Sequence, residues 1–192
     1  MRRGRIVAVL AAVVLPVSLA LAGAAIGGSP SPQAKAKQVT PAHQLEAAIN
    51  ASAKYISTAT VQKNGYALFS DIHKKQCIAE PGMGGMGVHF VNSTLVGDPS
   101  INSGRPESVV YRREPNGKLV LSALEYIVVR SAWLKTHKTR PYLYGQKFNL
   151  TGAGNRYGLP PFYSLHIWLW DTNPAGMFSM WNPQVHCTKI KK

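Results

Sequence analysis

The run Leu119–Val129 constrains the fold of this chain more than any other segment. It reads LVLSALEYIVV, is dominated by aliphatic residues, and is apolar on both of the faces that alternate along a strand. Such a run is typical of a central strand that is covered on both sides. The turn sequence EPNG at Glu114–Gly117 separates it from Ser108–Arg113 and predicts a hairpin. We therefore expect a sheet with Leu119–Val129 near its centre.

The rest of the chain predicts one helix and several further strands. Thr40-Pro41 resembles an N-cap followed by proline, and apolar residues then recur at helical spacing, which predicts one long amphipathic helix over Pro41–Asn64. Shorter strand-like runs follow at Tyr66–Phe69, Val88–Asn92, Tyr142–Phe148 and Phe162–Trp170. The predicted fold class is α+β, a single domain in which a long N-terminal helix packs on a mostly antiparallel sheet.

A glycine-rich segment, Gly82–Gly87, stands before one of these strands. It lacks the lysine and the following serine or threonine of a phosphate-binding loop, and the strand follows it, where a phosphate-binding loop would have the strand before it. We expect a loop in which the backbone closely approaches a ligand or another strand.

The first residues predict export. Three arginines among the first five residues precede the apolar segment 6–22, and small residues follow, as in a signal peptide over residues 1–25. Residues 26–39 are typical of a flexible linker, and residues 40–192 then form one globular domain. The alternative is an uncleaved membrane anchor, since about 20 apolar residues are enough to span a bilayer. We expect a protein that is secreted or associated with the cell envelope.

The chain has two cysteines, Cys77 and Cys187. In an exported protein they are expected to form one disulfide bond. It would close a loop of about 110 residues, for which loop-closure entropy predicts about 4–5 kcal/mol of stabilisation. The alternative is a metal site with the nearby His73 and His186. Neighbouring residues on an extended strand point to opposite faces, which disfavours His186 and Cys187 as ligands of one ion.

The chain is strongly basic, with a formal net charge of +14. Such a surface attracts anionic envelope polymers or lipid headgroups, and the tail Lys189–Lys192 belongs to it. No recognisable nucleic-acid module is present, so specific nucleic-acid binding is not expected. The alternative is a solvated surface that maintains solubility. The sequence does not define the oligomeric state.

Glu125 is an unusual carboxylate because it lies inside the most apolar run of the chain. Alternation along a strand places five apolar residues on its face: Leu119, Leu121, Ala123, Ile127 and Val129. A buried carboxylate must be paired, protonated or bound to a metal ion. The alternatives are a structural pair with an arginine or a tyrosine, or an edge position facing solvent.

His89 and His166 also lie within apolar strand-like runs. Together with Glu125 they form a set of ligands that suits a divalent transition metal, with positions left open for water or substrate. If they bind one ion, their side-chain ends must converge within about 5 Å. The alternative is two histidines that are hydrogen-bonded separately in a core.

Trp168 and Trp170 alternate with His166 and are expected to share its face. They are candidates for the walls of a ligand-binding pocket around this histidine. The alternative is that both are core residues.

Five stretches of the chain are similar to segments of a family of exported bacterial proteins of uncharacterised activity. They read AKYISTATVQKNGY, GMGGMGVHFVN, LSALEYIVV, LYGQKF and LHIWLWDTNPAGMFSMWNPQVHC, and they cover about Ala53 to Cys187. The resemblance implies export and a single domain. It places histidines at positions matching His89 and His166 and a glutamate at Glu125, and it implies no activity and no role for them.

Three functions are compatible with these features. The first is an exported protein that binds a metal ion or a small ligand through His89, Glu125 and His166. The second is a metal-dependent enzyme in which the same cluster activates water or oxygen. The third is an envelope-interaction protein whose basic surface acts and whose histidines are structural. The sequence contains no nucleophile elbow and no HExxH motif, which disfavours the familiar hydrolases.

Overall fold

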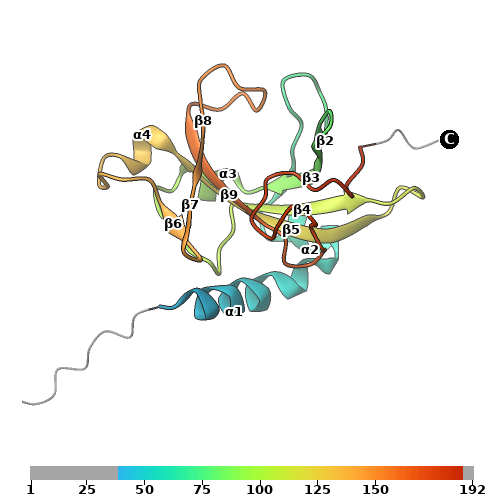
Figure 1. Ribbon diagram of the computed structural model, residues 1–192, viewed down its shortest axis with the longest axis horizontal. Coiled ribbons are helices and arrows are strands. Elements are labelled where there is room, and N and C mark those ends of the chain that lie inside the picture. Colours follow the sequence, from blue (N-terminus) through green and yellow to red (C-terminus); the bar gives the residue numbers. More distant parts are fainter. Residues whose placement is uncertain (1–38, 188–192) are drawn as a thin grey trace, which may run out of the picture. The chain divides into compact units, whose positions relative to one another are not determined.

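The computed structural model describes residues 39–187 (Figure 1). The predicted signal peptide 1–25, almost all of the predicted linker 26–39 and the basic tail Lys189–Lys192 lie outside the described residues. Within residues 39–187, no helix has both the length and the apolar character needed to cross a membrane.

A seven-stranded antiparallel sheet forms the body of the fold in the part of the chain that the structure describes. The strand order is β1-β3-β4-β5-β9-β8, and β2 also pairs with β3. The strands are β1 (Ala67–Leu68), β2 (Cys77–Glu80), β3 (Gly84–Val91), β4 (Ser108–Arg113), β5 (Leu119–Val129), β8 (Asn149–Thr151) and β9 (Phe162–Ile167). The central position of β5 and the β4–β5 hairpin confirm the expectation from the apolar run and its turn.

Two of the predicted strands differ in detail. The run Tyr142–Phe148 forms a separate small hairpin of β6 (Tyr142–Leu143) and β7 (Gln146–Lys147), because Tyr144 and Gly145 both adopt positive φ angles and turn the chain between them. The last long strand, β9, ends at Ile167 and does not continue to Trp170.

The prediction of one long N-terminal helix is wrong, and with it the α+β fold class as stated. The described chain is mostly antiparallel sheet with short helices. Pro41–Asn64 is divided into α1 (Pro41–Ser52), the 3-10 helix η1 (Ala53–Ile56) and α2 (Thr58–Lys63). Ser57 between the last two is extended, with φ −98° and ψ 126°. The remaining helices are α3 (Ser93–Gly97) and α4 (Arg130–Trp133).

The break has a physical cause in the side chains that are buried. Tyr55 is only 5% exposed, and its carbonyl oxygen accepts a hydrogen bond from the Tyr111 hydroxyl at 2.5 Å. Ile56, which the helical spacing places on the buried face, is 71% exposed. Ile56, Thr58 and Thr60 are β-branched, and such residues favour the helix less than unbranched ones do. Burial of Tyr55 therefore outweighs continuation of the helix.

The two faces of the sheet have different coverings. The helical segment of residues 41–63 covers one face (Figure 1), and Tyr55 and Val61 join the largest hydrophobic cluster there together with Val109, Leu124 and Leu165. Two smaller clusters form elsewhere, one around Ala123 and Trp168 and the other around Val96, Ile127 and Phe162. Ala123 and Ile127 alternate with Leu124 along β5, so these clusters lie on the opposite face of the sheet.

A bulge in β5 changes the face of its first residues. Val110 pairs with Ala123 whereas Tyr111 pairs with Leu121, so Ser122 is an extra residue on β5. Such a bulge reverses the alternation of side chains beyond it. Leu121 therefore packs in the cluster on the helix-covered face and Leu119 packs against it, so the expectation that these two residues share the face of Glu125 is wrong.

The C-terminal segment returns to the start of β3, where the glycines make room for it. Gly85 and Asn182 form an isolated bridge, and a Cβ atom at Gly85 would lie 2.7 Å from the carbonyl oxygen of Val185. The glycine-rich segment therefore permits close approach of another backbone, as expected, although strand β3 already begins at Gly84. The disulfide bond Cys77–Cys187 fixes the end of this segment to β2.

Candidate functional site

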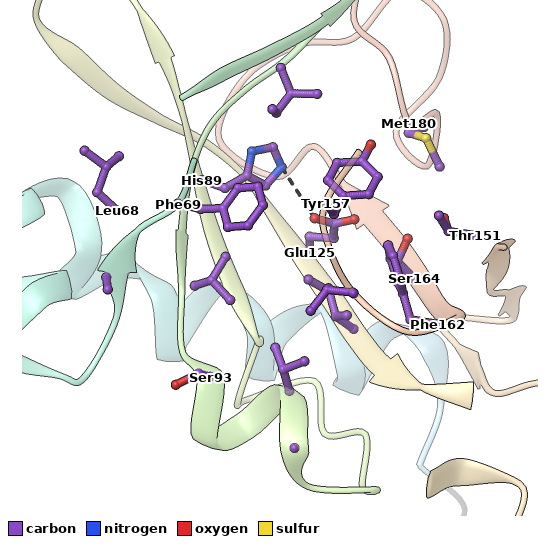
Figure 2. Close-up of a pocket in the computed structure, with 17 residues that line it drawn as sticks. Leu68, Phe69, His89, Ser93, Glu125, Thr151, Tyr157, Phe162, Ser164 and Met180 are labelled. Atoms are coloured by element: carbon purple, nitrogen blue, oxygen red, sulfur yellow. Dashed lines mark ion pairs between the residues drawn. The ribbon is translucent and has the colours of Figure 1, made fainter. Parts of the chain in front are cut away.

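The sheet brings His89, Glu125 and His166 together from three strands. Glu125 on β5 and His166 on β9 are directly opposite one another in the register. His89 is on β3, and strand β4 lies between it and β5. The β4 residue opposite Glu125 is Ser108, and the β4 residue opposite His89 is Val110, so the imidazole of His89 reaches the carboxylate diagonally across β4. Figure 2 shows His89 and Glu125 facing one another.

The distances confirm that the three side chains converge. One potential ligand atom from each residue lies within 4.8 Å of the other two. Nε2 of His89 lies 3.4 Å from Oε2 of Glu125, and the ring centres of His89 and His166 are 6.0 Å apart. All three residues are buried, with exposed fractions of 4%, 7% and 2% for His89, Glu125 and His166. The expectation of convergence within about 5 Å is therefore confirmed.

The imidazole groups of this cluster make no hydrogen bond among residues 39–187, although Nε2 of His89 forms an ion pair with Glu125 at 3.4 Å. Both ring nitrogens of His89 and of His166 are buried. The Oγ atom of Ser108 is also buried and has no hydrogen-bond partner among these residues. Each unsatisfied buried polar group costs about 1–3 kcal/mol. Two histidines that were simply structural would be expected to have partners, so the alternative of separately hydrogen-bonded core histidines does not describe this arrangement.

Burial and neighbouring charges determine the protonation states of Glu125 and His166. Burial alone would raise the pKa of the Glu125 carboxyl group, but the adjacent imidazole of His89, assisted by His166, lowers the pKa below its usual value. Burial lowers the pKa of His166 to about 4, against the attraction of the Glu125 carboxylate. Near neutral pH, Glu125 is therefore ionised and His166 is neutral.

Trp168 packs against His166 of this cluster. Its indole stacks on the ring of His166 with ring centres 4.9 Å apart, and its Nε1 donates a hydrogen bond to the carbonyl oxygen of Ser179. Trp170 instead packs against the cluster on the helix-covered face, and its Nε1 donates to Oγ of Ser52 in α1. Neither tryptophan lines the cavity described next. Their ligand-binding role stays a prediction.

A cavity of about 460 Å³ opens beside His89 and Glu125 (Figure 2). Most of its wall is apolar. The wall comes from the face of the sheet opposite the helical segment, from α3, and from the segments before β2 and before β9. The other lining residues are Ala67, Leu68, Phe69, Ile78, Val91, Ser93, Val96, Gly97, Ile127, Thr151, Tyr157, Leu159, Phe162, Ser164 and Met180. Its size and apolar character are those of a small-molecule site.

An ion pair between Asp71 and Arg156 lies close in the chain to two residues of the cavity wall, Phe69 and Tyr157. Nη2 and Nε of Arg156 donate to Oδ2 of Asp71 at 2.6 Å and 3.0 Å. The other carboxylate oxygen accepts from the backbone N–H groups of His73 and Lys75. Burial would raise the pKa of Asp71, but these hydrogen bonds and the Arg156 guanidinium lower it below its usual value. The pair joins the loop that follows Phe69 to the loop that carries Tyr157.

Several of these residues were not identified from the sequence. Ser108 is directly opposite Glu125, and Ser164 lies two residues before His166 on the same face of β9, so strand alternation could have found both. Tyr157 and the Asp71–Arg156 pair lie in irregular loops. No periodic pattern in the sequence marks such positions.

The alternative metal site at the cysteines is excluded by the disulfide bond. Cys77 and Cys187 are joined to one another, so neither offers a thiolate to an ion with His73 or His186. The expected disulfide is therefore confirmed. Comparisons of the whole chain with protein-family models, with curated proteins and with solved structures gave no match.

Proposed function

We propose that this protein binds a divalent transition-metal ion between His89, Glu125 and His166. The observation that carries the proposal is the group of buried imidazole nitrogens that converge on a buried carboxylate and make no hydrogen bonds within the described chain. A metal ion would satisfy one nitrogen of each ring and the carboxylate together. Two imidazoles and one carboxylate are a common ligand set for zinc, with a fourth position left open.

The geometry requires only a small adjustment. Ligand atoms about 2 Å from one tetrahedral ion lie about 3.3 Å from each other. The His89–Glu125 separation of 3.4 Å already fits this value. The widest separation in the cluster, up to 4.8 Å, must close by about 1.5 Å. Rotations of the imidazole rings on their fixed strands can supply this movement.

A second candidate is catalysis by the same ion, and the cavity favours it. His89 and Glu125 both line the cavity, so an open coordination position would face a space large enough for a substrate. A metal ion in such a position lowers the pKa of a bound water molecule or polarises a carbonyl group. Binding is the primary proposal because it rests on the ligand geometry alone.

We also propose that the protein acts outside the cytoplasm. The disulfide bond supports this location, because such bonds persist in oxidising compartments. The sequence pattern of residues 1–25 supports it independently. The test is the intact mass of the protein recovered outside the cell, which should correspond to cleavage near residues 22–25 and to one disulfide bond. A full-length protein in the cytoplasmic fraction would contradict export.

The test of the metal site is a calorimetric titration of chelator-treated protein with zinc. We expect one ion per chain for the wild type. Glu125→Gln should keep the fold but bind zinc at least tenfold more weakly, because a neutral amide is a poor ligand. His73→Asn is the matched control, since His73 is exposed and lies outside the cluster. Equal zinc affinity of the wild type and Glu125→Gln would contradict the proposal.

A further inference from the structure

We propose that the cavity beside this cluster binds a medium-chain aliphatic carboxylate, with its hydrocarbon chain along the apolar wall and its carboxylate on the metal ion. This inference rests on the proposed metal site and goes further by naming the class of ligand.

The cavity has a mostly apolar wall with a few polar groups. His89 and Glu125 line it, and Ser164 lies near Glu125 in Figure 2. Val96, Ile127 and Phe162 form a hydrophobic cluster that also lines it. A ligand with one polar head and a substantial apolar body matches this lining. The volume of about 460 Å³ is in the lower part of the range for small-molecule sites.

The charge of the site selects the sign of the polar head. A divalent ion together with the Glu125 carboxylate and two neutral imidazoles leaves a local charge of about +1, which complements a monoanion. Without the ion, the Glu125 carboxylate would repel a second carboxylate at this short range. Binding of the ligand should therefore depend on prior binding of the metal.

The Ser164 hydroxyl can hold the second oxygen of the ligand. Ser164 lines the cavity and lies near Glu125 in Figure 2, whereas the hydroxyl of Tyr157 is on the side of its ring away from Glu125. The aromatic ring of Tyr157 contributes to the wall of the cavity. The Asp71–Arg156 pair holds the loop of Tyr157 in place.

The experiment is a calorimetric titration of zinc-loaded and metal-free protein with butanoate, hexanoate and octanoate, and with octan-1-ol as the uncharged control. We expect octanoate to bind the zinc-loaded protein at least tenfold more tightly than the metal-free protein. The affinity should rise about fourfold with each added methylene group until the cavity is filled. Octan-1-ol should show a much smaller dependence on zinc.

A variant separates the cavity from the metal site. Val96→Phe, on α3, places a larger side chain in the apolar wall of the cavity and should weaken octanoate binding at least tenfold while zinc still binds. Ile56→Phe is the control, because Ile56 is 71% exposed and does not line the cavity.

Two failures are distinguishable. If the protein binds zinc but octanoate shows no zinc dependence or no chain-length dependence, the ligand inference is overturned and the metal site stands. If the protein binds no zinc, the metal site and the carboxylate ligand are both overturned. A weakening of octanoate by Ile56→Phe equal to that by Val96→Phe would also overturn the assignment of the cavity.

Discussion

Replacing His166 by leucine should have opposite effects on the metal-free and the zinc-loaded protein. His166 is 2% exposed, and both of its ring nitrogens lack hydrogen-bond partners within the described chain. Removing these unsatisfied groups should stabilise the metal-free protein by about 1–3 kcal/mol. Loss of the stacking on Trp168 and the change of shape should offset this by up to about 1.5 kcal/mol. We therefore expect His166→Leu to change the free energy of unfolding of the metal-free protein by between about −0.5 and +3 kcal/mol.

Zinc should reverse the order of stability. An ion that binds only the folded state stabilises it by about 2.7 kcal/mol when its concentration is 100 times the dissociation constant. The wild type should gain this amount, whereas His166→Leu, which has lost a ligand, should gain little. In zinc, the wild type should therefore be the more stable of the two proteins.

The assay is urea unfolding, followed by tryptophan fluorescence, in chelator and in excess zinc. His73→Leu is the control and should change the free energy of unfolding by less than about 0.5 kcal/mol in both conditions, because His73 is exposed. If His166→Leu destabilises the metal-free protein by more than about 2 kcal/mol, the histidine is an ordinary structural residue. Equal stabilisation of both proteins by zinc would also refute the reasoning.

Three further predictions concern parts of the structure around the site. The double variant Cys77→Ala/Cys187→Ala should lower the free energy of unfolding by about 5 kcal/mol in urea, since the bond closes a loop with a sequence separation of 110; a loss below about 1 kcal/mol would contradict this. Asp71→Ala should cost about 1.5–3 kcal/mol in the same assay, because it leaves the guanidinium of Arg156 without its partner; unchanged stability would show that the pair is dispensable. Burial raises the pKa of Glu107 to about 8, so the folded protein binds a proton there that the unfolded chain has released, and this contribution to stability is lost as pH rises through about 8. The stability of Glu107→Gln relative to the wild type should therefore increase between about pH 5 and about pH 8, and a difference independent of pH would refute the assignment.

The sheet and the convergence of the site were predictable because both depend on strong local patterns. The apolar run Leu119–Val129 and the EPNG turn define a central strand and its hairpin partner. A carboxylate inside such a run calls for partners, and His89 and His166 were the only comparably placed imidazoles. With two cysteines in a chain predicted to be exported, one disulfide pairing was available. Each of these inferences depends either on the alternation of side chains along one strand or on the small number of residues of one type in the chain.

The parts that were not predictable depend on contacts between distant residues. The helix breaks near Ser57 because Tyr55 must reach the core and accept a hydrogen bond from Tyr111. The bulge at Ser122 reverses the alternation of β5 and moves Leu121 to the other face. Helical and strand periodicities describe one element at a time, so they predict neither the helix break nor the bulge.

The cavity could not be predicted from the sequence either. Two residues of its wall, Phe69 and Tyr157, are close in the chain to Asp71 and Arg156, which form an ion pair although they are 85 residues apart. Neither Asp71 nor Arg156 lies in a periodic element. Asp71 lies between β1 and β2 and Arg156 between β8 and β9, so their pairing depends on the tertiary structure.

The most direct test of the metal site is anomalous diffraction from crystals of the protein grown with zinc, recorded on both sides of the zinc absorption edge. The account predicts a single strong peak about 2.0–2.2 Å from one nitrogen of His89, one nitrogen of His166 and one oxygen of Glu125. A map with no peak between these residues, in crystals whose zinc concentration is high enough to occupy surface sites, would contradict it.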